Sequence, residues 1–98
     1  MNLDTKKKLK SLRDSIDRLD TILINTLGER FKQTGAVGIL KLQAGLDASD
    51  LKRELAQMKR VEKIAKKNNL DPVFAKSLLK FVISEVKQNH NRLQKKNE

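Results

Sequence analysis

The chain has 98 residues, of which 38% are hydrophobic and 35% are charged, and its net charge at neutral pH is +10. This size suits one small domain, and chains this short often need an oligomer to bury enough surface. With no cysteine and a single histidine, His90, the sequence excludes a disulfide framework, a thiolate metal site and a histidine-rich metal cluster. The positive charge favours an anionic partner.

The N-terminal segment, residues 1–10, is polar and has no apolar run after its lysines. It is typical neither of a signal peptide nor of a membrane span, so we expect a cytoplasmic protein with no membrane partner. Lysines cluster here and again at Lys95 and Lys96, as in solvated, frayed ends. We therefore predict a single domain over residues 1–98, with its core at about residues 9–93.

The first predicted helix runs from about Thr5 to Gln43, and Gly45 suits its C-terminal stop. Its apolar stripe recurs at spacings of three and four residues, at Leu12, Ile16, Leu19, Leu23 and Leu27. Local signals would break this helix at residues 34–38, where two glycines each cost about 1 kcal/mol relative to alanine. Because the stripe keeps its phase there, we predict one continuous helix, and two helices with a loop are the alternative.

Two shorter helices follow. The second covers about residues 50–67, with Asp47 or Ser49 as candidate N-cap, and Asn68–Asn69 ends it. The third covers about residues 71–93 and begins with an Asp-Pro pair, which is typical of a helix start. No segment is predicted as a strand, so the expected fold class is all-α with three helices per chain.

The length of the first helix predicts a dimer. At 1.5 Å per residue, about 38 residues span about 57 Å, and two helices of about 20 residues cannot cover that length as one layer. Half of the apolar stripe would stay in water unless a second, antiparallel copy covered it. We therefore predict an intertwined six-helix homodimer.

Several polar residues lie on the apolar lines of these helices. With 100° per residue and Leu12 at zero, Arg30 falls at about 0° and Lys41 at about 20°, so both cations lie on the core side. His90 continues the stripe of the third helix, which is formed by Leu79, Ile83 and Val86. Since unpaired buried charges cost several kcal/mol each, their accumulation favours an anionic ligand that supplies the countercharge.

A purely structural role is the alternative for each of these residues. Arg30 would then pair with Glu54 in a buried ion pair, His90 would be a satisfied core histidine, and Lys41 would extend to solvent. For the whole chain, the alternative is a basic helical nucleic-acid-binding or scaffold protein. No Trp, no Tyr and three Phe leave few platforms for base stacking, so no nucleic-acid partner is expected.

The same residues carry a resemblance to the all-helical (type II) chorismate mutases, over about residues 9–93. Residues 12–20, LRDSIDRLD, resemble the family's LRxxIDxLD opening, and Gly28-Glu29-Arg30 resembles its AER. Lys41 stands where the family has a lysine, and residues 50–54, DLKRE, resemble DxxRE. The resemblance implies an intertwined dimer and an isomerase that rearranges chorismate to prephenate in aromatic amino-acid biosynthesis.

The resemblance also implies roles for individual residues. The catalytic residues would be Lys41, Arg30 and His90, and the substrate-binding residues would be Arg13, Asp50, Arg53, Glu54 and Val86. The arginines would bind the two substrate carboxylates, with Arg13 reaching in from the partner chain, and the two acids would receive the ring hydroxyl. Lys41 would donate to the ether oxygen, where negative charge gathers as the C–O bond breaks. Such a site needs fixed donors and a compact substrate conformer, but no metal, cofactor or covalent step.

Two positions depart from the family's pattern. Val86 stands where some members have a serine that binds substrate, and His90 stands where the family has glutamine or glutamate beside the ether oxygen. We expect neutral His90 to donate one N–H there in the free enzyme, because burial and nearby cations disfavour the charged ring. An isochorismate–pyruvate lyase of the same fold is the alternative that these motifs leave open.

Overall fold

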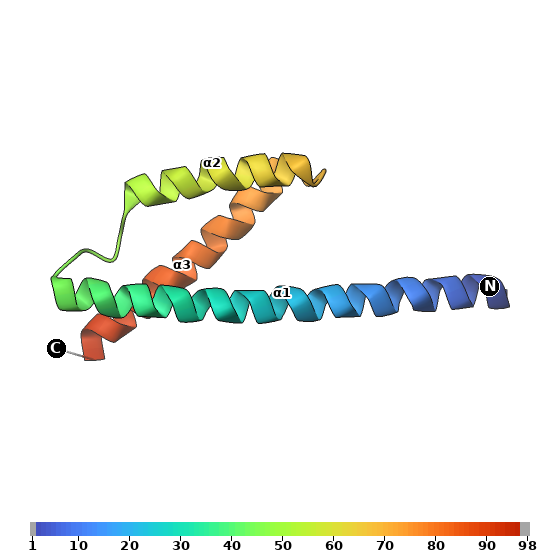
Figure 1. Ribbon diagram of the computed structural model, residues 1–98, viewed down its shortest axis with the longest axis horizontal. Helices are drawn as coiled ribbons and strands as arrows, with labels where there is room; N and C mark the ends of the chain where they lie inside the picture. Colours follow the sequence, from blue (N-terminus) through green and yellow to red (C-terminus); the bar gives the residue numbers. More distant parts are fainter. Residues whose placement is uncertain (1, 97–98) are drawn as a thin grey trace. The chain divides into compact units, whose positions relative to one another are not determined.

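The computed structural model describes residues 2–96, which form three helices and, within that range, no strand (Figure 1). Helix α1 is Leu3–Ala44, α2 is Leu51–Lys67 and α3 is Pro72–Lys96. The predicted all-α class with three helices is therefore confirmed. The chain divides into two compact units, with the boundary between Gln33 and Thr34. Among residues 2–96, no helix combines the length and apolarity that a bilayer crossing requires.

Helix α1 is continuous through residues 34–38, so the alternative of two helices with a loop there is wrong. The helix ends where Gly45 takes the left-handed φ of +71°, as its position predicted. The Gly45 amide donates to the Leu42 carbonyl at 3.3 Å, and the Leu46 amide donates to the Lys41 carbonyl at 2.8 Å. This pair of bonds is the Schellman motif, which satisfies the last carbonyls and places Lys41 in the final turn.

Helix α2 begins after Asp50, whose Oδ1 accepts a hydrogen bond from the Arg53 amide at 3.0 Å. The prediction of Asp47 or Ser49 as N-cap is therefore wrong. The side chain of the residue directly before the first turn is the one that reaches the third helical amide, and only Asp50 has that position. The predicted end is confirmed, because Asn68 is the C-cap and Asn69 takes a φ of +55°.

Helix α3 starts at the predicted Asp-Pro pair, where Asp71 Oδ1 accepts from the Val73 amide at 3.0 Å. It continues to Lys96, three residues beyond the predicted end at Leu93. The residues after Leu93 include no glycine or proline to stop the helix, so the last turn extends.

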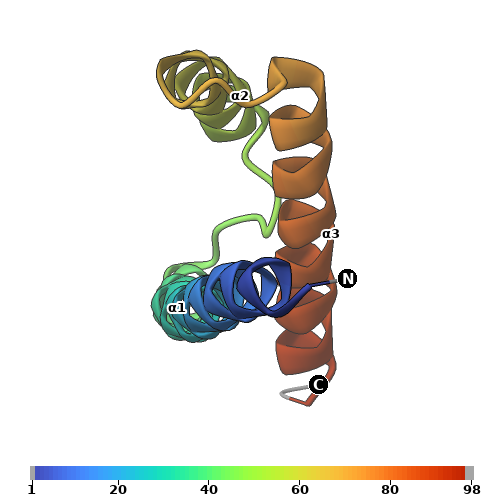
Figure 2. The ribbon, with the colours of Figure 1, turned by 90° about the vertical axis from the view of Figure 1, so that its right-hand side faces the viewer.

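The core of the second unit lies between α2 and α3, where Ala65 is 2% and Ala75 is 7% exposed. These small side chains let the two helices approach closely beside the turn at residues 68–71. Figures 1 and 2 show α3 leaving α2 at that turn and reaching residues 34–44 of α1 with its C-terminal turns. The second unit therefore has contacts at both ends of α3.

The first unit consists of the N-terminal part of α1, and its apolar stripe faces water in the single chain. The exposed fractions are 64% for Leu12, 53% for Ile16, 63% for Leu19 and 58% for Leu23. Ion pairs along the helix join Lys8 to Asp4 and Lys10 to Asp14. Exposed pairs of this kind contribute little to stability, so they do not replace a hydrophobic core.

Candidate active site

His90 of α3 packs directly on the backbone of α1. The residue is 6% exposed, and its Nε2 lies 3.1 Å from the carbonyl oxygen of Thr34. A Cβ built on Gly38 would lie 2.6 Å from His90 Cδ2 and 2.8 Å from Nε2, closer than side chains approach. The ring therefore reaches the helix because residue 38 is a glycine, and the buried position predicted from its helical phase is confirmed.

The second ring nitrogen of His90 has a different environment. Nδ1 is buried and has no hydrogen-bond partner among residues 2–96. His90 is therefore not the fully satisfied core histidine of the structural alternative. A buried polar atom without a partner costs free energy, so a site that retains one is a candidate for ligand binding.

Lys41 lies one turn after Gly38, at the C-terminal end of α1. Its side chain is half-buried, and Nζ donates to the Ala48 carbonyl at 3.3 Å in the segment before α2. An ammonium group has three donors, and this long bond uses one of them. The lysine is thus held beside the loop and does not extend freely into solvent.

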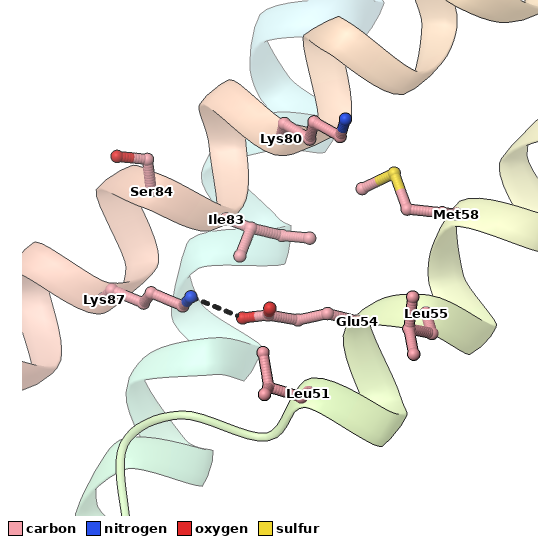
Figure 3. A pocket seen from close by; sticks show the side chains of 8 residues that line it. All are labelled: Leu51, Glu54, Leu55, Met58, Lys80, Ile83, Ser84 and Lys87. Atoms are coloured by element: carbon pink, nitrogen blue, oxygen red, sulfur yellow. Dashed lines mark ion pairs between the residues drawn. The ribbon is translucent and has the colours of Figure 1, made fainter.

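Glu54 of α2 forms an ion pair with Lys87 of α3, with 2.8 Å between Oε1 and Nζ (Figure 3). The two side chains are 22% and 37% exposed. They belong to a groove of about 600 Å³ between α2 and α3, lined by Leu51, Glu54, Leu55, Met58, Lys80, Ile83, Ser84 and Lys87. The ion-pair partner of Glu54 in this unit is therefore Lys87, in place of the Arg30 expected for a purely structural role.

The sequence alone assigns no contact to Lys87 or Gly38, although each position carries a signal. Lys80, Ile83 and Lys87 recur at three and four residues, so these lysines share a helix face with an apolar residue. Gly38 lies inside a continuous helix, where glycine is unfavourable unless close packing requires it. Both signals gain meaning only when the opposite helix is known.

Three further predicted residues of the second unit lie near these contacts along the chain. The Asp50 carboxylate is committed to capping α2, and Arg53 is exposed in the first turn of that helix. Val86 is half-buried, one turn before His90. The hydroxyl that serine would supply at that position is therefore absent, and an apolar side chain stands in its place.

The two remaining predicted residues belong to the first unit. Arg13 is exposed, whereas Arg30 is half-buried. The Nη1 atom of Arg30 is buried and, among residues 2–96, has no hydrogen-bond partner. A guanidinium with an unpaired donor is suited to a carboxylate, which matches its two-pronged geometry.

Comparison with known proteins identifies the family to which these features belong. Residues 12–91 match the family model of chorismate mutase type II. The chain belongs to the type II chorismate mutase family. A search of curated proteins found no match. The matched range includes every predicted site residue from Arg13 to His90, and the all-helical type II family agrees with the three helices observed. Membership implies chorismate mutase-type isomerase chemistry.

Proposed function

We propose that this chain is a chorismate mutase that rearranges chorismate to prephenate. The contact of His90 with residues 34–38 of α1 carries the proposal, since it brings an imidazole to the helix within about one turn of Lys41. His90 on α3 and Lys41 on α1 are thereby associated with the same segment of α1, since Lys41 follows Gly38 by three residues. The family match over residues 12–91 supplies the substrate class.

The reaction explains why donors and cations suffice. Within one molecule, the ether C–O bond breaks and a new C–C bond forms, so no atom leaves or enters. Negative charge gathers on the ether oxygen while two carboxylates stay charged. A protein accelerates such a step by holding the compact conformer and placing fixed donors at the oxygen.

The cations divide these tasks. Lys41 donates to the ether oxygen, exchanging its long bond to the Ala48 carbonyl for a charge-assisted one. Arg30 and Arg53 bind the carboxylates, and the buried, unpartnered Nη1 of Arg30 supports this role. His90 is the second donor at the ether oxygen.

The acids of α2 bind the ring hydroxyl of the substrate. Lys87 holds Glu54 through Oε1, which leaves the second carboxylate oxygen to accept from the hydroxyl. Asp50 stands one turn earlier and fixes the start of α2. Val86 offers an apolar contact where a hydroxyl would add a hydrogen bond.

The active form is an intertwined homodimer in which Arg13 reaches the partner's site. The stripe of the first unit and the groove between α2 and α3 are both apolar and both exposed in the single chain. In the proposed dimer, the stripe of one chain covers the groove of the other chain. Because the pairing is two-fold, both stripes and both grooves are buried at once. We also expect the protein to act in the cytoplasm.

The decisive experiment follows the absorbance of chorismate after addition of purified protein, with the product identified by chromatography. Loss of chorismate with formation of prephenate supports the proposal. Release of pyruvate from isochorismate, without turnover of chorismate, would support the lyase instead. Variants of Lys41 and Arg30 give the control, because a contaminating mutase would not respond to them.

A further inference from the structure

Two residues of α1, Thr34 and Gly38, fix the ring of His90 through backbone contacts. We propose that they are positioning residues which make the imidazolium, donating through Nδ1, the catalytic form of His90. This inference rests on the proposed function, because it concerns the donor at the ether oxygen. It assigns the two ring nitrogens to different tasks, one structural and one catalytic.

The first step concerns Nε2. It lies 3.1 Å from the Thr34 carbonyl oxygen, and a carbonyl oxygen only accepts hydrogen bonds. Nε2 must therefore carry the hydrogen of this bond. In the neutral ring, one nitrogen carries a hydrogen and the other has a lone pair. Neutral His90 consequently has no hydrogen on Nδ1, the buried nitrogen without a partner in residues 2–96.

Gly38 is what makes this geometry accessible. The Thr34 carbonyl already accepts the helical bond of the residue four positions later, which is Gly38, and a carbonyl has two lone pairs. The ring uses the second lone pair by placing its Cδ2–Nε2 edge where a Cβ of residue 38 would stand, within 2.8 Å. Nδ1 lies across the ring from that edge, and so it faces away from the α1 backbone.

The second step concerns the ligand. The ether oxygen of chorismate is an acceptor, so a neutral His90 with its lone pair on Nδ1 would repel it. A hydrogen bond forms only when Nδ1 is also protonated. The sequence led us to expect that the neutral ring donates to the substrate. In the structure, the single N–H of the neutral ring donates instead to the Thr34 carbonyl. The proton stays on His90 throughout, and no proton transfer enters the rearrangement.

The charged residues around His90 bear on when the ring gains its second proton, which we expect when the substrate binds. Lys41 is the titratable residue of residues 34–44, and Lys87 and Arg92 lie within one turn of His90 on α3. Glu54 of α2 is neutralised by Lys87 at 2.8 Å, and Glu85 lies 3.6 Å from Arg92. The two acids nearest these cations are thus already paired, and a bound dianion supplies the countercharge that an imidazolium requires.

Nitrogen NMR tests the assignment without any measurement of activity. His90 is the one histidine of the chain, so ¹⁵N-histidine labelling gives one pair of ring signals. In the free protein at pH 8, we expect hydrogen on Nε2 and a lone pair on Nδ1. On addition of prephenate, which keeps two carboxylates, we expect both nitrogens to become protonated. Hydrogen on Nδ1 of the free neutral ring, or a prephenate complex with a singly protonated ring, would overturn the proposal.

The pH profile gives the kinetic counterpart. We expect kcat/KM of the wild-type protein to fall about tenfold per pH unit above the titration of His90, and kcat to fall at a higher pH, since kcat reports the complex. His90→Gln supplies an amide that donates at every pH, so its profile should be flat over the same range. A flat wild-type profile would overturn the proposal.

Gly38→Ala tests the positioning role, with Gly35→Ala as the matched control in the same helix. A Cβ at residue 35 has no neighbour within 4 Å, whereas one at residue 38 displaces the ring. We expect Gly38→Ala to lower kcat roughly tenfold or more with little change in KM, and to mix the two neutral tautomers in the spectrum. Gly35→Ala should keep the wild-type kcat and spectrum. Equal behaviour of the two variants would overturn the positioning role.

These outcomes separate the inference from the proposed function. If the protein does not convert chorismate, the proposed function fails, and the nitrogen spectrum of the free protein still confirms or contradicts the bond from Nε2 to Thr34. If chorismate turns over while the prephenate complex has a neutral ring, the proposed function stands and the imidazolium is excluded.

Discussion

The two units of this chain both expose large apolar side chains, but only the second has buried residues between its helices, among those that the structure describes. In the first unit, Leu12 and Leu19 are more than 60% exposed, at 64% and 63%. In the second unit, Leu51 and Phe81 are as exposed, at 71% and 75%. However, Ala65 is 2% and His90 is 6% exposed, because α2 and residues 34–44 of α1 lie against α3. A periodic stripe thus predicts a helix with an apolar face, and it does not show what covers that face.

The comparison extends to the polar residues on those stripes. His90 in the second unit has its neighbours within the same chain, at Thr34 and Gly38. Arg13 in the first unit is exposed in the single chain, and its neighbour in the proposed site belongs to a second chain. The proposed site therefore combines residues that one chain positions with residues that the dimer must position.

The largest expected effect comes from a charge in the exposed stripe of the first unit. In the proposed homodimer, Leu23→Asp removes two buried leucines at about 1.5–3 kcal/mol apiece and adds two buried charges. The variant should therefore lose the dimer and with it the folded state. Sedimentation and circular dichroism at micromolar concentration measure both. Asn25→Asp, about 160° away from Leu23 on the helix, is the control and should stay dimeric. A stable folded monomer of the wild-type chain would contradict the comparison.

The next effect concerns one cation from each unit. Arg30→Ala and Lys41→Ala should each lower the rate of chorismate turnover roughly 10²-fold or more, the scale for removing one preorganised electrostatic donor. The fold should survive, because an uncompensated charge is removed from a partly buried position. Steady-state kinetics and thermal melting provide the measurements. If both variants kept near-normal turnover, the structural roles of these residues would be the better account.

A smaller effect is expected in the core between α2 and α3. Ala65→Leu adds three carbons at a position that is 2% exposed, so overpacking should cost about 1–3 kcal/mol in the free energy of unfolding. Urea titration measures the loss. Ala56→Leu, at an exposed position of α2, makes the same substitution without that contact and should be close to neutral. Equal stability of the two variants would show that α2 and α3 do not pack through Ala65.

The smallest expected effect is the change in Tm when an ion pair is removed from one unit or the other. The hydrogen-bonded Lys66 ammonium, together with the charge of Lys76 on α3, lowers the pKa of Glu62 from its ordinary value of 4.5. A lowered carboxyl pKa contributes stability above the unfolded-state value, and that stability is lost as the pH falls through the folded-state value.

Glu62→Gln should therefore lower Tm slightly at pH 7, and the difference from wild type should vanish in acid. Glu29→Gln in the first unit removes a pair with Lys32 that lies within one helix, and it should change Tm less. Thermal melts of both variants at pH 7 and at about pH 3 give the comparison. A difference for Glu62→Gln that persists unchanged in acid would assign its effect to packing.

The sequence by itself determined the helices and most of their ends. Glycine at residue 45, the Asn-Asn pair after Lys67 and the Asp-Pro pair before Val73 each act on backbone groups a few residues away, so their effect is readable locally. The cap of α2 was missed because several acceptors precede that helix. Only the realised first turn decides that Asp50 reaches the Arg53 amide.

Tertiary structure decided what the site residues contact. Helical phase placed His90 on an inner face, but the bond of Nε2 to Thr34 joins residues 56 positions apart, and no local pattern encodes it. The same holds for Lys87 beside Glu54 and for Gly38 beneath the imidazole. Phase is a property of one helix, whereas the choice of nitrogen, partner and protonation state depends on the distance between two helices, which packing alone sets.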